Sequence, residues 1–146
     1  MRVVLQRVAS ARVIVADRTV GEIGRGWLVL VGIATDDTIA RLQWMAEKIA
    51  VLRCFPDESG RMNRSVQDIG GSVLVVSNFT LYADAQQGRR PSFLAAARPD
   101  IAEPLYRAFL DQCRALGLPV QCGEFGADMR VELANDGPVT LVLDAP

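Results

Sequence analysis

Short apolar runs separated by turn residues make up the first third of the chain. Asp17-Arg18 and Gly24-Arg25-Gly26 interrupt stretches that are rich in β-branched side chains. This punctuation predicts short strands joined by tight turns. We expect these strands over residues 3–8, 12–16, 19–23 and 27–33.

A later run, 72–79, is apolar on both faces, which is typical of a central strand. Residues 55–60 have the composition of a turn, and residues 83–99 form a polar loop that carries Arg89-Arg90. Three further strands are expected to begin at residues 120, 129 and 139.

Two segments have the apolar spacing of amphipathic helices. The first runs to about Leu52, with Asp36 or Asp37 as its N-cap. Its expected apolar stripe is Ile39, Leu42, Ala46 and Ile49. The spacing therefore predicts that the apolar face of this helix packs against the hydrophobic core.

The second helix is expected over about 101–116, because Asp100 and Glu103 have the spacing of a capping box. Pro104 then falls in the first turn, and Gly117 follows the last helical residue. Its expected apolar stripe is Ile101, Leu105, Phe109, Cys113 and Leu116.

Helices interrupt a mainly β chain without strict alternation, which predicts an α/β protein with mixed or antiparallel sheets. The length of 146 residues fits a single domain, 1–146. The longest apolar run, 27–34, contains Gly32 and is too short to span a membrane. We therefore expect no membrane association.

The sequence contains no histidine, which removes Ser-His and Cys-His nucleophile pairs and histidine metal sites. Lys48, the only lysine, falls inside the first predicted helix. Cys54, Cys113 and Cys122 are odd in number and lack a C-x-x-C spacing, which favours a reducing cytoplasm over a disulfide framework or a zinc site. We expect no metal and no other cofactor.

The net charge of −1 argues against an extended nucleic-acid interface. However, the basic residues are almost all arginines, whose planar side chains suit phosphate. These arginines are also consistent with ordinary solvated faces. A protein that meets only the end of an RNA needs few phosphate contacts, so the charge leaves that partner open.

Two short segments carry the candidate chemistry. In residues 135–140, a Gly-Pro step separates two apolar runs, a pattern typical of a hairpin turn. In residues 77–83, Ser77 and Thr80 place hydroxyl groups at a predicted strand end, where turn residues are common. No base lies beside Thr80, which argues against a threonine nucleophile, so the backbone N–H groups around Phe79 and Thr80 are the candidate oxyanion donors.

Together these segments resemble the signature pair of the D-aminoacyl-tRNA deacylases, which read Ser-Gln-Phe-Thr-Leu and Asn-x-Gly-Pro-Val-Thr. The resemblance covers nearly the whole chain and implies a barrel-like core of mixed or antiparallel sheets with two main helices. Asn78 departs from the pattern, because the family usually has Gln there. Four further segments look like family segments, in order: 1–8, 62–68, 88–93 and 126–129.

The resemblance implies a homodimeric hydrolase that removes D-amino acids from tRNA in the cytoplasm, with help from the 2′-hydroxyl of the RNA. In this family the Gly-Pro step is cis and enters the partner subunit's active site. Its carbonyl oxygens bind the α-amino group and leave no room for an L side chain. Gly137 and Pro138 are thus the implied chiral filter. Because glycine has no side chain to exclude, Gly-tRNA is an expected secondary substrate.

The resemblance also assigns roles to single residues. Arg7 braces the Gly-Pro loop through backbone carbonyls, and Met129 packs beside that loop. The implied catalytic and ester-binding residues share one segment: Ser77, Asn78, Phe79 and Thr80. Leu81 and Asn135 complete the implied pocket, although Asn135 is equally typical of an Asx turn and Phe79 of a core aromatic.

Three other functions remain open from the sequence. A sister group of deacylases accepts L-alanyl-tRNA through a trans Gly-Pro step. Its motif is similar to that of residues 77–81 but has Ala at the position of Phe79, so Phe79 favours the D-specific group. A noncatalytic module that binds RNA ends would use the same fold. An unrelated β-rich dimerisation domain fits the composition but not the resemblance along the chain.

Overall fold

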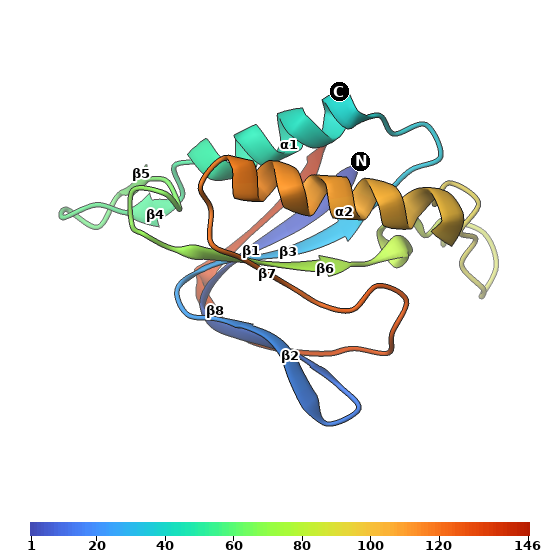
Figure 1. The fold of residues 1–146 in the computed structure, drawn as a ribbon, viewed down its shortest axis with the longest axis horizontal. Helices are drawn as coiled ribbons and strands as arrows, with labels where there is room; N and C mark the ends of the chain where they lie inside the picture. Colours follow the sequence, from blue (N-terminus) through green and yellow to red (C-terminus); the bar gives the residue numbers. More distant parts are fainter.

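One long strand organises the sheet. The computed structural model describes all residues, 1–146, and its β1 (Arg2–Val15) pairs antiparallel with three neighbours (Figure 1). The first half of β1 pairs with β3 (Gly26–Gly32), and the second half pairs with β2 (Arg18–Ile23). On its other edge, β1 pairs with β8 (Arg130–Asp144) along most of its length.

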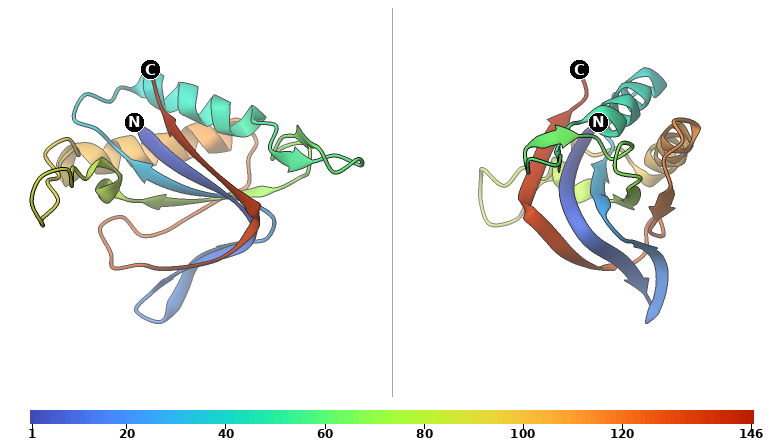
Figure 2. Two further views of the ribbon diagram at one scale, coloured as in Figure 1. Left: turned by 180° about the vertical axis from the view of Figure 1, so that it is seen from behind. Right: turned by 90° about the vertical axis from the view of Figure 1, so that its left-hand side faces the viewer.

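The sheet is mixed. β3 pairs in parallel with β6 (Ser72–Ser77), which pairs in parallel with β7 (Val120–Cys122). The six strands curve into a nearly closed, barrel-like sheet, and α1 (Ile39–Val51) and α2 (Pro99–Ala115) lie side by side over one face (Figure 2). The expected α/β fold with a barrel-like mixed sheet and two helices is confirmed. Neither helix combines the length and the apolar character needed to cross a membrane.

The strands differ from the sequence prediction mainly in continuity. The runs expected over 3–8 and 12–16 form one strand that ends at Val15, because β1 keeps its pairing through irregularities near Val8 and Ser10. β6 ends at Ser77, and a 3₁₀ turn, η1 (Phe79–Tyr82), follows it. Irregular pairing lets a strand bend without ending. Turn-forming residues in the sequence therefore do not show whether the strand stops or only bends.

The expected cap of α1 is wrong. The helix begins at Ile39 after Thr38, and no side chain caps it. Asp37 instead accepts a hydrogen bond from the Ala34 backbone N–H (2.7 Å) and pairs with the amino group of Met1. Ile39 is exposed, so the apolar stripe starts at Leu42.

The expected start of α2 is also wrong. The helix begins at Pro99, which has no N–H to satisfy and a φ already suited to a first turn. Pro104 therefore lies inside the helix, and Glu103 pairs with Arg107 (2.7 Å) rather than capping. Of the expected stripe, Phe109 and Cys113 are buried and Ile101 is exposed, and the buried residues of the helix are Ala102, Tyr106, Phe109, Leu110 and Cys113.

The end of α2 agrees with the sequence prediction, whereas a small hairpin after α1 was not predicted. Gly117 has φ +79° and closes α2 by donating to the Arg114 carbonyl (2.9 Å), as expected for a C′ glycine. The predicted turn at 55–60 is part of a hairpin that the sequence did not reveal, formed by β4 (Phe55–Pro56) and β5 (Met62–Arg64).

Two hydrophobic clusters hold the sheet. The larger lies between the sheet and the two helices and contains 23 buried residues, among them Trp27, Phe55 and Phe109. The smaller contains seven buried residues and includes Val13 and Leu74. Burial on both faces explains why β3 and β6 are almost continuously apolar, and it fixes the strand ends from which the site is built.

Candidate functional site

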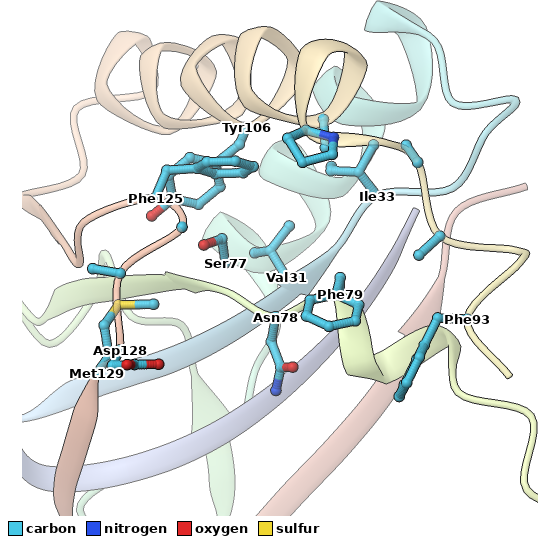
Figure 3. Close-up of a pocket in the computed structure, with 16 residues that line it drawn as sticks. Val31, Ile33, Ser77, Asn78, Phe79, Phe93, Tyr106, Phe125, Asp128 and Met129 are labelled. Atoms are coloured by element: carbon cyan, nitrogen blue, oxygen red, sulfur yellow. The ribbon is translucent and has the colours of Figure 1, made fainter. Parts of the chain in front are cut away.

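A cavity of about 480 Å³ opens where the parallel strands β3 and β6 end (Figure 3). The carboxyl ends of parallel strands meet at one edge of a sheet, where ligands commonly bind. The start of α2 and the loop after β7 complete the wall, which is mostly apolar. The lining residues are Val31, Ile33, Ser77, Asn78, Phe79, Phe93, Ala96, Ala97, Pro99, Ala102, Tyr106, Phe125, Gly126, Ala127, Asp128 and Met129.

Asn78 shapes the mouth of this cavity. Its backbone N–H donates to the Val31 carbonyl (2.7 Å), which ties the end of β6 to β3. Its side-chain oxygen accepts hydrogen bonds from the Thr80 backbone N–H (3.2 Å) and the Thr80 hydroxyl. Asn78 therefore caps η1 and directs the chain out of the sheet.

The turn at η1 leaves Phe79 more than half exposed at the cavity mouth. Its ring packs edge-on against Phe93, with 5.0 Å between ring centroids. The alternative that Phe79 is a core aromatic is wrong. An exposed aromatic pair beside a cavity is suited to bind a flat apolar ligand such as a nucleobase.

The inner wall is rigid. The hydroxyl of Tyr106, a buried residue of α2, donates to the Val75 carbonyl (2.9 Å), and its ring packs against Phe125 with centroids 5.8 Å apart. Burial raises the pKa of Tyr106 far above its ordinary value of 10.0, so this hydroxyl stays protonated. Asp128 is the only acidic side chain of the wall, which contains no basic side chain.

Thr80 lies outside the cavity wall and is exposed. Its hydroxyl is engaged by Asn78 rather than by a base. The Thr80 N–H also donates to Asn78, so it is not a free oxyanion donor. The structure thus gives Thr80 no partner that would convert its hydroxyl into a nucleophile.

The Gly-Pro step lies in the middle of β8, so the hairpin interpretation is wrong. Gln6 pairs with Thr140 and Val8 pairs with Asn135, which leaves Arg7 alone opposite the four residues 136–139. The Gly137–Pro138 peptide is cis. Both flanking segments pair with β1, so β8 continues through the extra residues as one strand, which bends sharply along its length (Figure 2).

Arg7 holds this bulge. Its Nε donates to the Asp136 carbonyl (3.1 Å) and lies 3.2 Å from the Asp136 carboxylate. Its Nη1 donates to the Cys54 carbonyl (2.6 Å), so the side chain joins the bulge to the segment after α1. Arg7 is buried, whereas Gly137 and Pro138 are exposed.

No group of three or more histidine, cysteine, aspartate or glutamate side chains is arranged to hold a metal ion. The cysteines do not pair with one another, and burial raises the pKa of Cys113 to about 12. The candidate chemistry therefore rests on the cavity and on the bulge of β8.

Comparison with known proteins identifies the family. The model of the family described as D-Tyr-tRNA(Tyr) deacylase matches residues 4–144. The chain belongs to this deacylase family. A D-aminoacyl-tRNA deacylase of Opitutus terrae is 58% identical, with 99% of this chain and 97% of the relative covered. One of Symbiobacterium thermophilum is 55% identical, with 99% and 96% covered.

A solved structure shares the fold of this deacylase family member. It is named c-Myc DNA Unwinding Element Binding Protein, and it matches with a TM-score of 0.94 at 43% identity. The match covers 100% of this chain and 99% of that chain. The fold match therefore extends over the whole chain.

The fold gathers only some of the residues that the resemblance to the deacylases implied. Ser77, Asn78, Phe79 and Met129 line the cavity. The other implied residues lie outside its wall: Arg7, Thr80, Leu81, Asn135, Gly137 and Pro138. Asn135 pairs in the ladder and its side chain makes no hydrogen bond within the chain, so the Asx-turn alternative is wrong.

Sequence reasoning missed three aromatic residues of the cavity. Phe93 belongs to a segment recognised as family-like, but no role was assigned to it. Tyr106 lies on the buried stripe of α2, one turn from Ala102, so a correct helix start would have directed it inward. Phe125 lies in an irregular loop, and no local pattern points to it.

Proposed function

We propose that this chain, acting as one domain, hydrolyses the ester bond of D-aminoacyl-tRNA. Water attacks the ester carbonyl, the bond to the ribose oxygen breaks, and the products are a free D-amino acid and tRNA. Membership of the deacylase family over residues 4–144 is the observation that carries this proposal. The cytoplasm, where aminoacyl-tRNA is used, is the proposed setting.

The cavity suits the end of an aminoacyl-tRNA. The exposed Phe79–Phe93 pair offers a face for the terminal adenine, where base–aromatic stacking contributes about 1–3 kcal/mol. Ser77 and Asn78 lie beside it with hydrogen-bonding groups for the ribose and the ester. No side chain there is placed to activate water, so the vicinal 2′-hydroxyl of the RNA assists the attack in this proposal.

The chiral filter requires a second copy of the chain. Gly137 and Pro138 are exposed on β8 and do not line the cavity of their own chain, which supports insertion of this bulge into a partner subunit's cavity. Their carbonyl groups would bind the α-ammonium group and block the position of an L side chain. A rigid wall rejects by exclusion, whereas attractive contacts would distinguish the two forms weakly.

Turnover of matched substrates tests the function. The purified protein is expected to cleave D-Tyr-tRNA, to spare L-Tyr-tRNA, and to cleave glycine attached to tRNA-Ala at a measurable rate. Binding of D-Tyr-tRNA without turnover would instead identify a noncatalytic module that binds RNA ends. Preferential cleavage of L-Ala-tRNA would identify the sister activity, and equal turnover of both tyrosyl forms would refute the filter.

A further inference from the structure

Residues 85–98, which we call the arginine loop, have a local charge unlike that of the whole chain. The segment contains Arg89, Arg90 and Arg98 and no acidic residue, although the chain as a whole has a net charge of −1. It connects η1 to α2. A local concentration of positive charge on an otherwise acidic protein attracts anionic partners to that part of the surface.

The first two arginines have no partner within the chain. Neither Arg89 nor Arg90 makes a side-chain hydrogen bond or an ion pair, and both are exposed. The carboxylate that precedes the loop, Asp84, accepts from the Gln86 backbone N–H (3.0 Å). Most arginines elsewhere are engaged, as in the pairs of Arg12 with Glu132 (2.6 Å) and of Arg41 with Asp36 (2.9 Å), with Arg61 as an exposed exception.

Arg98 adds to this charge. Its only ion pair, with Asp100, has a length of 3.6 Å, and both side chains are largely exposed. Such a pair contributes little in water and leaves the guanidinium available.

The loop is fixed to the cavity. Asp84 and Ser92 exchange two backbone hydrogen bonds of 2.8 Å, which close the base of the tip that carries Arg89 and Arg90. The Ala97 N–H donates to the Ile33 carbonyl (2.9 Å) and anchors the far end. Phe93, next to the closed base, lines the cavity (Figure 3). The positive charge is therefore built on the same segment as the cavity wall.

We propose that the arginine loop binds the phosphodiester backbone of the nucleotides that precede the terminal adenosine. This inference rests on the proposed function, which places that adenosine in the cavity. Arginine forks bind phosphate oxygens in two-pronged contacts. Leu94, which is 90% exposed beside Phe93, offers an apolar surface to an unstacked base.

The test compares two substrates of different length. Arg89→Gln/Arg90→Gln is assayed on D-Tyr-tRNA and on the D-tyrosyl ester of adenosine, which has the reacting group but no phosphodiester. We expect kcat/KM on D-Tyr-tRNA to fall about tenfold at roughly 0.1 M salt, with a salt dependence weaker by about one to two charges. Turnover of the adenosine ester is expected to stay unchanged.

Arg61→Gln is the matched control. Arg61 is also exposed, and its side chain makes no ion pair or hydrogen bond, but it belongs to the β4–β5 hairpin at the opposite end of the molecule from the arginine loop (Figure 1). Its substitution removes one positive charge, where the double variant removes two, so it is compared with the single variants Arg89→Gln and Arg90→Gln as well. It is expected to leave turnover of both substrates unaffected. An equal loss of tRNA turnover in the control would overturn the proposal, because it would show a dependence on total charge.

Other outcomes separate this proposal from the proposed function. Equal losses of the double variant on both substrates, or no loss on D-Tyr-tRNA, would overturn the role of the loop. If the wild-type protein cleaves neither substrate, the proposed function fails, and binding of uncharged tRNA then tests the loop by itself. Weaker binding by the double variant but not by Arg61→Gln would support the loop, and equal binding by all three proteins would overturn it.

Discussion

At the scale of single residues, Gly137 has the most restrictive surroundings at the proposed filter. Its φ is +122°, a conformation that L side chains rarely adopt, and an added Cβ would lie 2.6 Å from Nη2 of Arg7. The Arg7 side chain cannot easily move away from this Cβ, because it is buried and donates hydrogen bonds to the carbonyls of Asp136 and Cys54. A side chain at residue 137 must therefore displace either the bulge or its brace.

Gly137→Ala is expected to lower kcat/KM for D-Tyr-tRNA by at least about tenfold while the protein stays folded, because tenfold corresponds to about 1.4 kcal/mol of lost transition-state stabilisation. Gly60→Ala is the control, since Gly60 also has positive φ (+79°) but has no atom within 4 Å of an added Cβ. Kinetics and thermal unfolding of both variants check this. Equal activity of Gly137→Ala and wild type would contradict the proposed role of the bulge.

Thr80→Ala is expected to keep most of the deacylation rate, with a loss of less than about tenfold. The Thr80 hydroxyl donates to Asn78 and has no base beside it, so removing it loosens the η1 cap without removing a nucleophile. Single-turnover kinetics on D-Tyr-tRNA measure the effect. A trapped acyl-threonine in the wild-type protein, or complete loss of activity in the variant, would reverse this assignment.

The candidate residues were predictable where the resemblance assigned them a role, as it did for Met129 and for three neighbouring residues of one segment. Ser77 ends β6, and Asn78 and Phe79 follow it directly, so a single sequence motif placed the three together. Phe125 reaches the same cavity from a distant loop, so only the tertiary arrangement reveals it. The two unpaired arginines at the loop tip were visible as a sequence pair, but their separation from every carboxylate required the structure.

At the scale of secondary-structure elements, the pairing of β1 with β8 carries most of the architecture. Arg2 and Asp144 face each other at one end of this pair, and Arg2 donates from Nε to Asp144 Oδ1 (2.8 Å) and from Nη2 to Oδ2 (3.1 Å). The hydrogen bonds and charge of Arg2 hold the pKa of Asp144 below its ordinary value of 3.8. A carboxylate with a lowered native pKa stabilises the fold at neutral pH.

Asp144→Asn is expected to reduce the free energy of unfolding at pH 7 by up to about 1 kcal/mol, as for other exposed ion pairs. The difference from wild type should persist down to the ordinary pKa of aspartate and vanish as the pH falls through the lower native pKa, because the wild-type carboxyl is then protonated too. Urea unfolding at several pH values measures it. Asp17→Asn, at a carboxylate without a hydrogen-bond partner, is the control, and an unchanged difference at the lowest pH would contradict the argument.

Element types were easier to predict than element ends. The strand runs 19–23, 27–33 and 72–79 follow directly from β-branched residues buried on both faces or alternating with polar ones, although the last of them ends as a strand at Ser77. The continuity of β1 and of β8 did not follow, because Ala9-Ser10 and Gly137-Pro138 have the local composition of turns. Long-range pairing between the two strands outweighs that local preference.

At the scale of the whole molecule, the cavity and the bulge belong to different surfaces of one chain, so the proposed active site needs two chains. We propose a homodimer in which twofold symmetry gives two equivalent sites. Each site would combine the cavity of one protomer with Gly137 and Pro138 of its partner. The prediction is a dimer in solution, measured by sedimentation at micromolar concentration.

Mixing two inactive variants tests this sharing of sites. Phe79→Ala damages the cavity and Gly137→Ala damages the bulge, so a mixed dimer contains one site with both parts intact. After exchange at equal concentrations, half of the dimers are mixed, and about a quarter of wild-type activity is expected to return. No recovery, despite mixed dimers verified by mass, would show that each chain completes its own site.

The position of Arg7 also bears on how selectivity responds to heat. Arg7 belongs to β1, which pairs with β3 at this position and with β8 on either side of the bulge, so the brace of the bulge is part of the central strand of the sheet rather than of a loop. Segments of this kind open mainly through cooperative unfolding of the whole domain. On warming, the preference for D- over L-Tyr-tRNA should therefore stay constant until the unfolding transition begins, and then disappear together with the folded protein.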